Sequence, residues 1–494
     1  MRPALVLLLV AALLGAAAAP ARAAGLEIGM EDERLLLGGG PDAVAAAADW
    51  KALGVDVVRI HAQWGSIAPR RRPAGFDAAD PGDPRYGWGA LDRAVGIARA
   101  AGLEVMLTVT GPGPAWTSRV PARHNPRWEP SATEFGRFAH AVAARYGGLV
   151  DRYLIWNEPN QPGWLQPQSE CRRRVCTPVA PHVYRALVRA ATPQIHAADP
   201  GSEVLLGELA PVGDPPRHAS APLAPLPFLR ALGCVDRAYR PLRGGRCAGF
   251  KPAAADAFGY HPHPVRNAPD HVNPDRDEAQ IADLPRLFAT LDKLTARKRI
   301  LTPGDRFPVH LTEFGYQTSP PDHAIGITLA QQARYLQQAS YIAWRSGRVR
   351  SLSFYQWDDE PVLSRGPGTR AYTGWQSGLR FVDGRPKPAL ATFPAPLVID
   401  RSRGVLWGQV RPDAAPEVTV MIRSRGEAAF RDLETVTAGA DGAFELSLAL
   451  EPGASYRYRW APAPPLLGPA PAPRLSGTVD LARPEATRLR ASES

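Results

Sequence analysis

The chain has 494 residues, of which 45% are hydrophobic and 21% are charged, a composition that excludes an intrinsically disordered protein and suffices for one large domain and a small one. The formal net charge is +10, but the positive residues are scattered, so the clustered stripe of a nucleic-acid-binding protein is absent from the sequence. The arginine runs at 70–72 and 172–174 are expected on solvated loops; the alternative places them beside a cleft that favours acidic ligands.

The first 23 residues have the anatomy of a secretory signal peptide. The chain starts Met-Arg-Pro, an apolar stretch covers residues 4–19, and an A-x-A cleavage site follows at residues 21–23. Because the apolar stretch is shorter than the ~20 residues that span a bilayer, we expect secretion to the extracellular space rather than an uncleaved membrane anchor. No later segment is apolar enough to be a membrane span.

Between residues 24 and 395, strand-like runs alternate with amphipathic helical runs. The expected strands are Leu26–Gly29, Val55–His61, Glu104–Thr110, Arg152–Asn157, Val204–Glu208, Ala257–Tyr260, Val309–Glu313 and Ser351–Gln356. The expected helices include Ala43–Leu53, Trp88–Ala101, Ala132–Tyr146, Tyr184–Ala198, Ile281–Lys298 and Leu329–Ser346. Eight strands separated by helices predict an α/β fold, a (β/α)8 TIM barrel catalytic domain over residues 24–395. An open doubly wound sheet is the alternative, although no G-x-G-x-x-G follows a strand.

The four cysteines lie in the two longest connections of this expected barrel. Cys171 and Cys176 follow the fourth strand, and Cys234 and Cys247 follow the fifth. Four cysteines allow three pairings, of which we expect the two local disulfides, in agreement with export. Their spacing does not indicate zinc, since no histidine pair accompanies them. Long loops at the carboxyl-terminal rim of a barrel usually shape the substrate cleft.

Residues 396–494 predict a C-terminal β-sandwich domain with a Pro-rich tail. Helical periodicity stops after residue 388 and short alternating runs follow: Val405–Val410, Val418–Arg423, Ala443–Leu448 and Tyr456–Trp460. The Pro-rich segment 461–473 is expected to be extended. A structural lid or spacer is the first interpretation. Carbohydrate binding, the alternative, would need a surface aromatic platform among Trp407, Tyr456, Tyr458 and Trp460, which could equally form the core.

Two glutamates stand where expected strands end. Glu158 closes the run Tyr-Leu-Ile-Trp-Asn-Glu before Pro159, and Glu313 closes Val-His-Leu-Thr-Glu before Phe-Gly. Carboxylates at the ends of buried strands are costly to keep there without a use. Two of them converging on one cleft would allow cleavage of a glycosidic bond, one as the acid that protonates the leaving oxygen and one as the anion that attacks or stabilises the sugar carbon.

The segments Trp-Asn-Glu-Pro-Asn at 156–160 and Thr-Glu-Phe-Gly at 312–315 resemble the retaining glycoside hydrolases of clan A, nearest to family 39, with family 5 also similar. In that clan the acid/base glutamate follows an asparagine on strand four and the nucleophile ends strand seven. The resemblance implies that Glu158 is the acid/base and Glu313 the nucleophile. It covers residues 26–393 and implies β-type equatorial linkages or α-L-arabinosides rather than α-glucans.

The same resemblance implies roles for four polar residues near strand ends. Arg59 resembles the arginine that hydrogen-bonds the nucleophile, and Asn157 resembles the residue that binds the sugar 2-hydroxyl. Tyr260 and His261 resemble the aromatic and imidazole groups that face the nucleophile, one of the two being only structural. A phenol that donated to Glu313 would keep it anionic.

Aromatic residues supply further substrate-binding candidates. Trp357 resembles the tryptophan that floors the sugar subsite, with a core tryptophan as the alternative. His61, Trp64 and Trp116 are weaker subsite candidates. The chain departs from family 39 at Gly315, where that family usually has asparagine.

Other chemistries fit the sequence less well. His261 and His263 lie two apart, but no third ligand has convincing spacing, so we expect no metal and no cofactor. An esterase would need a G-x-S-x-G elbow, which is absent from the sequence. The expected partner is a carbohydrate substrate. Two alternatives remain beside a hydrolase: a non-catalytic saccharide-binding protein on a retained barrel, and a transglycosylase that uses the same residues.

Overall fold

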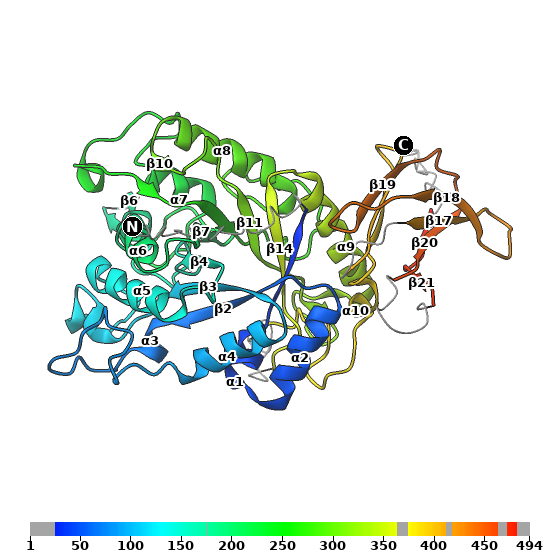
Figure 1. Ribbon diagram of the computed structural model, residues 1–494. Coiled ribbons are helices and arrows are strands. Elements are labelled where there is room, and N and C mark those ends of the chain that lie inside the picture. Colours follow the sequence, from blue (N-terminus) through cyan, green and yellow to red (C-terminus); the bar gives the residue numbers. More distant parts are fainter. Residues whose placement is uncertain (1–24, 174, 363–373, 412–416, 463–471, 482–494) are drawn as a thin grey trace, which may run out of the picture.

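The computed structural model describes residues 25–173, 175–362, 374–411, 417–462 and 472–481, so the expected signal peptide and most of the Pro-rich tail lie outside the described residues. Eight parallel strands close into a barrel in the order β1-β14-β11-β9-β7-β4-β3-β2 (Figure 1). The strands are β1 (Glu27–Glu31), β2 (Val57–Gln63), β3 (Glu104–Thr110), β4 (Arg152–Ile155), β7 (Glu203–Leu209), β9 (Ala257–Tyr260), β11 (Val309–Phe314) and β14 (Val349–Tyr355). The predicted TIM barrel is confirmed, and the doubly wound alternative is wrong, because β1 pairs with both β2 and β14.

The period of two along each strand decides which side chains reach the barrel interior. On β2, Val58 and Ile60 pack into the large core under the helices, whereas Val57 belongs to a small separate cluster with Met106, Leu154, Leu205 and Ala257, one residue from each of five neighbouring strands. Arg59 and His61 therefore share the interior face with Val57. Apolar side chains fill the lower interior, and polar ones follow toward the carboxyl ends of the strands.

Helices surround the barrel (Figure 1). They are α1 (Glu33–Gly38), α2 (Gly40–Ala52), α3 (Trp64–Ile67), α4 (Gly89–Ala100), α5 (Ala132–Tyr146), α6 (Ala180–Ala198), α7 (Pro225–Leu232), α8 (Leu284–Ala296), α9 (Leu329–Arg345) and α10 (Pro388–Thr392). The six predicted helices correspond to α2, α4, α5, α6, α8 and α9. The short helices α1, α3, α7 and α10 were not predicted, because four to eight residues give too little periodicity to recognise.

Both local disulfides are present. Cys171 and Cys176 pair across the hairpin of β5 (Ser169–Arg172) and β6 (Val175–Pro178), and Cys234 is bonded to Cys247. Each bridge closes a short loop, so its stabilisation is local to one of the two long connections.

The C-terminal domain consists of two antiparallel sheets, as predicted. The first sheet contains β15 (Leu397–Asp400), β16 (Val405–Gln409) and β19 (Ala443–Ser447), and the second contains β18 (Arg431–Val436), β17 (Val418–Arg423), β20 (Ser455–Trp460), β21 (Arg474–Leu475) and β22 (Val479–Asp480). Trp407, Tyr456, Tyr458 and Trp460 are all buried, with at most 6% exposed, so these four residues form core and offer no sugar platform.

The sandwich is fixed to the barrel through α9. Trp407 packs at a tilted angle against Tyr341 and Trp344 of this helix, with ring-centroid distances of 5.6 and 5.9 Å. The Tyr341 hydroxyl donates to Asp400, and the Trp344 indole donates to Asp441. These apolar and polar contacts favour a structural role for the domain.

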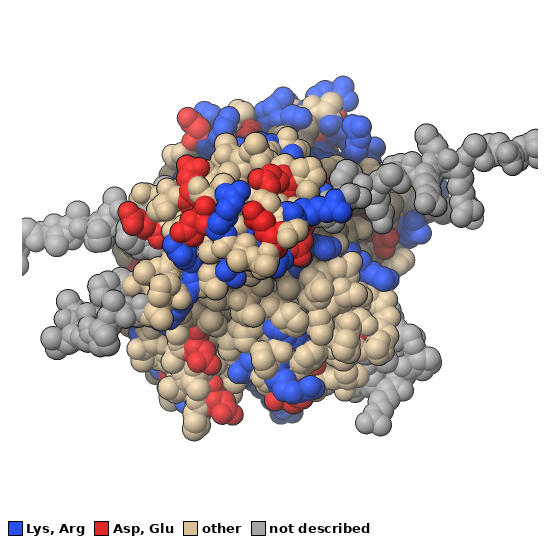
Figure 2. Space-filling view, turned by 90° about the vertical axis from the view of Figure 1, so that its right-hand side faces the viewer, with Lys and Arg blue, Asp and Glu red and all other residues tan. Residues whose placement is uncertain are grey.

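Positive and negative side chains lie interspersed on the face shown in Figure 2. None of the helices among the described residues combines the length and the hydrophobicity that crossing a bilayer requires.

Candidate active site

Charged side chains converge at the carboxyl ends of the barrel strands. Glu31 ends β1, Arg59 lies on β2, Glu208 and Glu313 lie near the ends of β7 and β11, and His261 directly follows β9. Parallel strands of a barrel bring their carboxyl ends together at one rim, where the active sites of this fold lie. Five strands thus contribute to one cluster of charges.

Arg59 is the centre of this cluster. Its Nη1 donates to Glu31 Oε2 at 2.7 Å and to Glu313 Oε1 at 2.6 Å. Its Nη2 donates to Asn157 Oδ1 at 2.6 Å and to Glu208 Oε2 at 2.7 Å. The guanidinium is fully buried, so these contacts act with little solvent screening. The predicted contact between Arg59 and Glu313 is present.

His261 joins the two predicted catalytic carboxylates. Its Nδ1 lies 3.2 Å from Glu158 Oε1, and its Nε2 lies 3.4 Å from Glu208 Oε2 and 3.5 Å from Glu313 Oε1. Burial alone would lower the pKa of His261, but the carboxylates of Glu313, Glu158 and Glu208 outweigh it and raise the pKa to about 10. The imidazole is therefore a second buried cation between the acids.

The pKa values of two neighbouring acids in this cluster are shifted in opposite directions. Burial would raise the pKa of Glu313, but His261 and Arg59 together hold it well below its usual range. Burial raises the pKa of Glu31 to about 8, since Arg59 offsets it only in part and Glu313 adds repulsion. At neutral pH Glu313 is thus an anion while Glu31 keeps its proton.

Glu208 belongs to the cluster although its role was not predicted. Its side chain is fully buried, accepts from the Thr312 hydroxyl at 2.7 Å and pairs with Arg59. Glu158 and Glu208 both have positive φ angles, 38° and 51°, which are uncommon for residues with a side chain and recur at functional sites. Glu208 ends a predicted strand just as Glu313 does, so its position in the sequence could have identified it as a site residue. Glu31 lies two residues beyond its predicted strand, so the same criterion would have missed it.

His61 and Glu33 extend the cluster along one wall. Glu33 Oε2 accepts from the His61 backbone N–H at 2.9 Å and lies 3.0 Å from His61 Nδ1. A ring nitrogen of His61 lies within 4.8 Å of carboxylate oxygens of Glu31 and Glu313. Trp164 packs edge-on against the imidazole with ring centroids 5.7 Å apart. The structure therefore places His61, a weak sequence candidate, near Glu313.

Three of the aromatic candidates, Tyr260, Trp64 and Trp357, are buried, and in the described part of the chain they make their hydrogen bonds and ring contacts with residues other than the carboxylates of the cluster. The Tyr260 hydroxyl donates to the carbonyl of Ala279 rather than to Glu313, so Tyr260 is the structural member of the Tyr260–His261 pair. Trp357 is buried against Trp50 with ring centroids 6.1 Å apart, and Trp64 is buried against Phe135 and Phe138. Both are core tryptophans because their strand-end segments turn outward toward helices. Trp116 donates to the Pro69 carbonyl and packs on Phe76.

Trp375 and Tyr355 are aromatic residues near His263 and contact each other with ring centroids 5.7 Å apart. Trp375 is 44% exposed and stacks on His263 with ring centroids 5.9 Å apart. His263 Nε2 lies 3.6 Å from Glu313 Oε2, and its Nδ1 accepts the backbone N–H of Gly315. A Cβ at Gly315 would lie 2.0 Å from the Tyr355 carbonyl oxygen, so only glycine fits where family 39 usually has asparagine.

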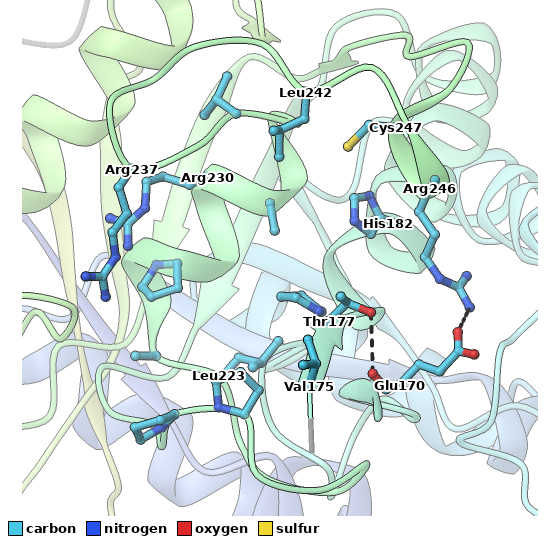
Figure 3. Close-up of a pocket in the computed structure, with 18 of the residues that line it drawn as sticks. Glu170, Val175, Thr177, His182, Leu223, Arg230, Arg237, Leu242, Arg246 and Cys247 are labelled. Carbon is cyan, nitrogen blue, oxygen red and sulfur yellow. Dashed lines mark hydrogen bonds and ion pairs between the residues drawn. The ribbon is translucent and has the colours of Figure 1, made fainter. Parts of the chain in front are cut away.

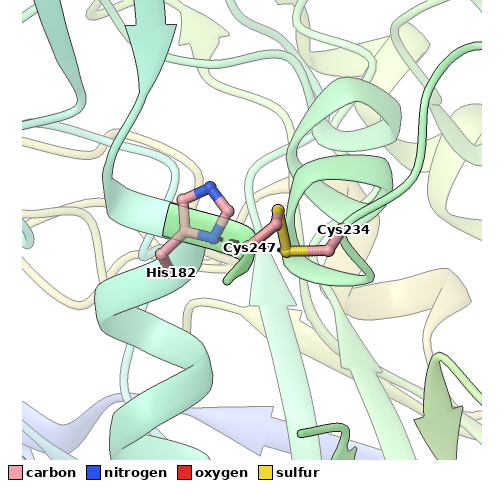
Figure 4. A group of neighbouring side chains, drawn as sticks. All are labelled: His182, Cys234 and Cys247. Carbon is pink, nitrogen blue, oxygen red and sulfur yellow. Dashed lines mark hydrogen bonds between the residues drawn. A yellow bond between two sulfur atoms is a disulfide. The ribbon is translucent and has the colours of Figure 1, made fainter. Parts of the chain in front are cut away.

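Within the described part of the chain, three groups of side chains have the spacing of metal ligands. Two of them, His261–His263–Glu313 and Glu31–His61–Glu313, share carboxylates that already bind the Arg59 guanidinium. The third contains Cys234 and Cys247, whose sulfurs are joined to each other beside His182 (Figure 4). The donor sets of the first two groups are better matched to the arginine than to a metal ion.

A cavity of about 870 Å³ lies between the two disulfide-closed loops. Figure 3 shows Leu223, Val175 and Leu242 within it, flanked by Arg230 and Arg237 on one side and by the Glu170–Arg246 pair on the other. None of the charged residues that surround Arg59 lines this cavity. It therefore belongs to the stapled loops rather than to the carboxylate cluster.

No family model and no curated protein matches the chain. Similar solved structures include a family 39 glycoside hydrolase from the gut symbiont Bacteroides cellulosilyticus, with 15% identity and a TM-score of 0.49 over 87% of this chain and 80% of that one. Another is GH10 from Paenibacillus barcinonensis, with 14% identity and a TM-score of 0.44 over 74% of this chain and 94% of that one. A third is GH5_18 from Streptomyces cattleya in complex with GlcNAc, with 17% identity and a TM-score of 0.46 over 74% of this chain and 78% of that one. Because these TM-scores are below 0.5, the chemistry of this chain is inferred from its own side chains.

Proposed function

We propose that the protein is a secreted retaining glycoside hydrolase in which Glu158 is the acid/base and Glu313 the nucleophile. The observation that carries the proposal is the bridge formed by His261, which contacts Glu158 through one ring nitrogen and Glu313 through the other. Both glutamates remain partly open to solvent, with 21% and 11% of their side chains exposed, so a substrate can reach them. The two local disulfides agree with an extracellular protein.

In the first step, the Glu313 carboxylate attacks the anomeric carbon while Glu158 gives its proton to the leaving oxygen. Arg59 holds one oxygen of Glu313, Oε1, and His263 faces the other, so the carboxylate is ionised and oriented before substrate arrives. The charge-assisted contacts to a buried guanidinium supply the preorganisation that a covalent nucleophile requires.

The charges of the cluster balance at both stages of this mechanism. In the free site Arg59 and His261 carry two positive charges, Glu208 and Glu313 carry two negative ones, and Glu31 holds a proton. The first step requires that Glu158 also carries a proton. When Glu313 becomes a glycosyl ester, it loses its negative charge. Glu158 has by then given up its proton and so carries a negative charge instead. Because the total is unchanged, the same two cations stabilise both states, and Glu158 can then take a proton from the attacking water.

The assignment of Glu158 is tested with Glu158→Ala on aryl glycosides of different leaving-group ability. We expect a loss of roughly 10²–10⁴-fold on poor leaving groups, a smaller loss at the first step on activated ones, and recovery of turnover by azide, which replaces water without needing a base. Equal losses on all substrates without azide rescue would contradict this assignment.

A further inference from the structure

Glu208 is a buried carboxylate that no step of the proposed mechanism uses. Its side chain has no exposed surface, whereas 21% of the Glu158 side chain and 11% of the Glu313 side chain are exposed. The neighbouring strand β9 leaves room for this carboxylate, since a Cβ at Gly259 would collide with Glu208 Oε1. A carboxylate is costly to bury unless its contacts replace the lost water, so the contacts of Glu208 indicate its role.

The contacts of Glu208 lead to both proposed catalytic acids. Its Oε2 accepts from Arg59 Nη2 at 2.7 Å and lies 3.4 Å from His261 Nε2. Its Oε1 accepts from the hydroxyl of Thr312, the residue that precedes the proposed nucleophile, at 2.7 Å. Its backbone carbonyl accepts the N–H of Glu158 at 2.9 Å. Glu208 therefore contacts the groups that hold the two acids, without reaching the cleft itself.

Glu208 and Glu313 share two partners. Arg59 donates to Glu208 Oε2 through Nη2 and to Glu313 Oε1 through Nη1, at 2.7 and 2.6 Å. His261 Nε2 lies 3.4 and 3.5 Å from the same two oxygens. A guanidinium is always charged in proteins. Burial would raise the pKa of Glu208, but Arg59, His261 and the Thr312 hydroxyl outweigh it, so Glu208 is an anion. The charge of Arg59 is therefore divided between Glu208 and Glu313.

We infer that Glu208 is a positioning residue for the nucleophile: it holds Arg59 and His261 in place and, as a second anion on them, weakens their stabilisation of the Glu313 carboxylate. This inference rests on the proposed glycosidase function. In the first step a Glu313 oxygen forms a bond to the anomeric carbon, and the bond to the leaving oxygen breaks with its electron pair, so Glu313 gives up its negative charge. Glu158 meets His261 at the other ring nitrogen, Nδ1, so the side chain of Glu208 acts at the Glu313 end of the bridge.

The charge of Glu208 should affect the two chemical steps in opposite directions. Without it, Arg59 stabilises the Glu313 carboxylate more strongly, which disfavours the glycosyl ester because ester formation removes that charge. Release of the sugar regenerates the carboxylate, so the same change favours release. Loss of alignment alone would slow both steps, because the reacting atoms must be in line in either direction. The ratio of the two rate constants therefore separates an effect of charge from structural damage.

The ratio is measured in Glu158→Ala, so that Glu313 is the one catalytic acid present. 2,4-Dinitrophenyl 2-deoxy-2-fluoro-β-glycosides of gluco, galacto and xylo configuration form the ester without an acid, and azide releases the sugar without a base. Adding Glu208→Gln should lower the rate constant of ester formation, relative to that of release, by about tenfold or more, because a nearby charge changes the ionisation of a carboxyl by ~10–10³-fold. The amide keeps the volume and an oxygen that can accept from Arg59.

Glu203→Gln in the same background is the matched control. Glu203 begins the same strand, β7, and lies 3.1 Å from Nε of another arginine, Arg152, at the amino end of the barrel. Removing its charge should leave the ratio unchanged. Should Glu208→Gln not fold by circular dichroism, Glu208→Asp and Glu208→Asn are compared instead, since they differ from each other in charge at equal length.

A ratio in Glu208→Gln within about threefold of that of its parent, or an equal fall in Glu203→Gln, would overturn the inference while leaving the proposed function intact. If neither amide variant of Glu208 folds, the residue is required by the fold, and the inference is overturned as well. Absence of ester formation with every fluoroglycoside, in the natural protein and in Glu158→Ala, would instead contradict the proposed function.

Discussion

Replacing Arg59 by lysine should damage catalysis in a way that its pH dependence reveals. The guanidinium donates four hydrogen bonds from two nitrogens: two to the carboxylates of Glu208 and Glu313, one to the carboxyl group of Glu31 and one to the amide of Asn157. A lysine ammonium is a point charge with three donors, so at least one bond is lost and the forked geometry cannot be reproduced. With ~1.5–3 kcal/mol for each bond to a charged group, loss of one or two corresponds to about 10–10⁴-fold in kcat/KM.

The sign of the pH effect follows from the contact with Glu313. Arg59 helps to hold the pKa of Glu313 below its usual range, so a weaker cation lets that pKa rise. Glu313 then becomes protonated, and inactive as a nucleophile, at a higher pH than in the natural protein. The acidic limb of kcat/KM should therefore move to higher pH, which a pH–rate profile on one aryl glycoside measures.

Arg152 provides a matched control at the opposite end of the barrel. It also contacts three carboxylates, those of Glu27, Glu104 and Glu203, at the amino ends of their strands. Arg152→Lys should lower the free energy of unfolding without moving the acidic limb. An unmoved limb in Arg59→Lys, or an equal movement in Arg152→Lys, would refute the reasoning.

Further predictions concern stability and substrate binding. The pKa of Glu31 is raised from 4.5 to about 8 and that of His261 from 6.5 to about 10, so the folded protein holds protons that the unfolded chain loses. The stabilisation from Glu31 is complete below pH ~4.5 and is lost as the pH rises to about 8; that from His261 is complete below pH ~6.5 and is lost as the pH rises to about 10. Tm should therefore fall as the pH rises through this range, and it should fall less steeply in Glu31→Gln. An equal dependence of Tm on pH in the two proteins would contradict the assignment of Glu31. Trp375→Ala should raise KM with little change in Tm, whereas Trp357→Ala should cost about 3–5 kcal/mol of stability, measured by denaturant unfolding. A raised KM without loss of stability in Trp357→Ala, with loss of stability in Trp375→Ala, would instead support Trp357 as the substrate-binding residue.

The barrel was predictable because its signals are local. Strands such as Glu104–Thr110 and Ala257–Tyr260 are short runs rich in apolar and β-branched or aromatic residues, and their observed bounds equal the expected ones. Glu158 and Glu313 were singled out because each ends a predicted strand, and Arg59, Asn157 and His261 because they resemble polar residues of clan A near strand ends. The fold brings these five residues together because it brings the strand ends together.

The tryptophans were harder to place because direction, not position, decides their role. Trp357 follows the last barrel strand but points between the barrel and α2, whereas Trp375, eighteen residues later, returns to His263. Glu31 and Glu33 lie beyond the apolar run of their strand and resemble an ordinary charged loop in the sequence. Their importance depends on contacts with Arg59 and His61, residues of another strand that only the closed barrel brings near.

The identity of the nucleophile is the central claim, and covalent trapping tests it most directly. A 2-deoxy-2-fluoro glycoside with an activated leaving group slows hydrolysis of the glycosyl ester more than its formation, so the intermediate accumulates. We predict a mass increase of one fluoroglycosyl unit on the peptide that contains Glu313, and none in Glu313→Gln. A label on Glu208 or Glu31, or turnover of the parent glycoside by Glu313→Gln at more than a few per cent of the natural rate, would contradict the account.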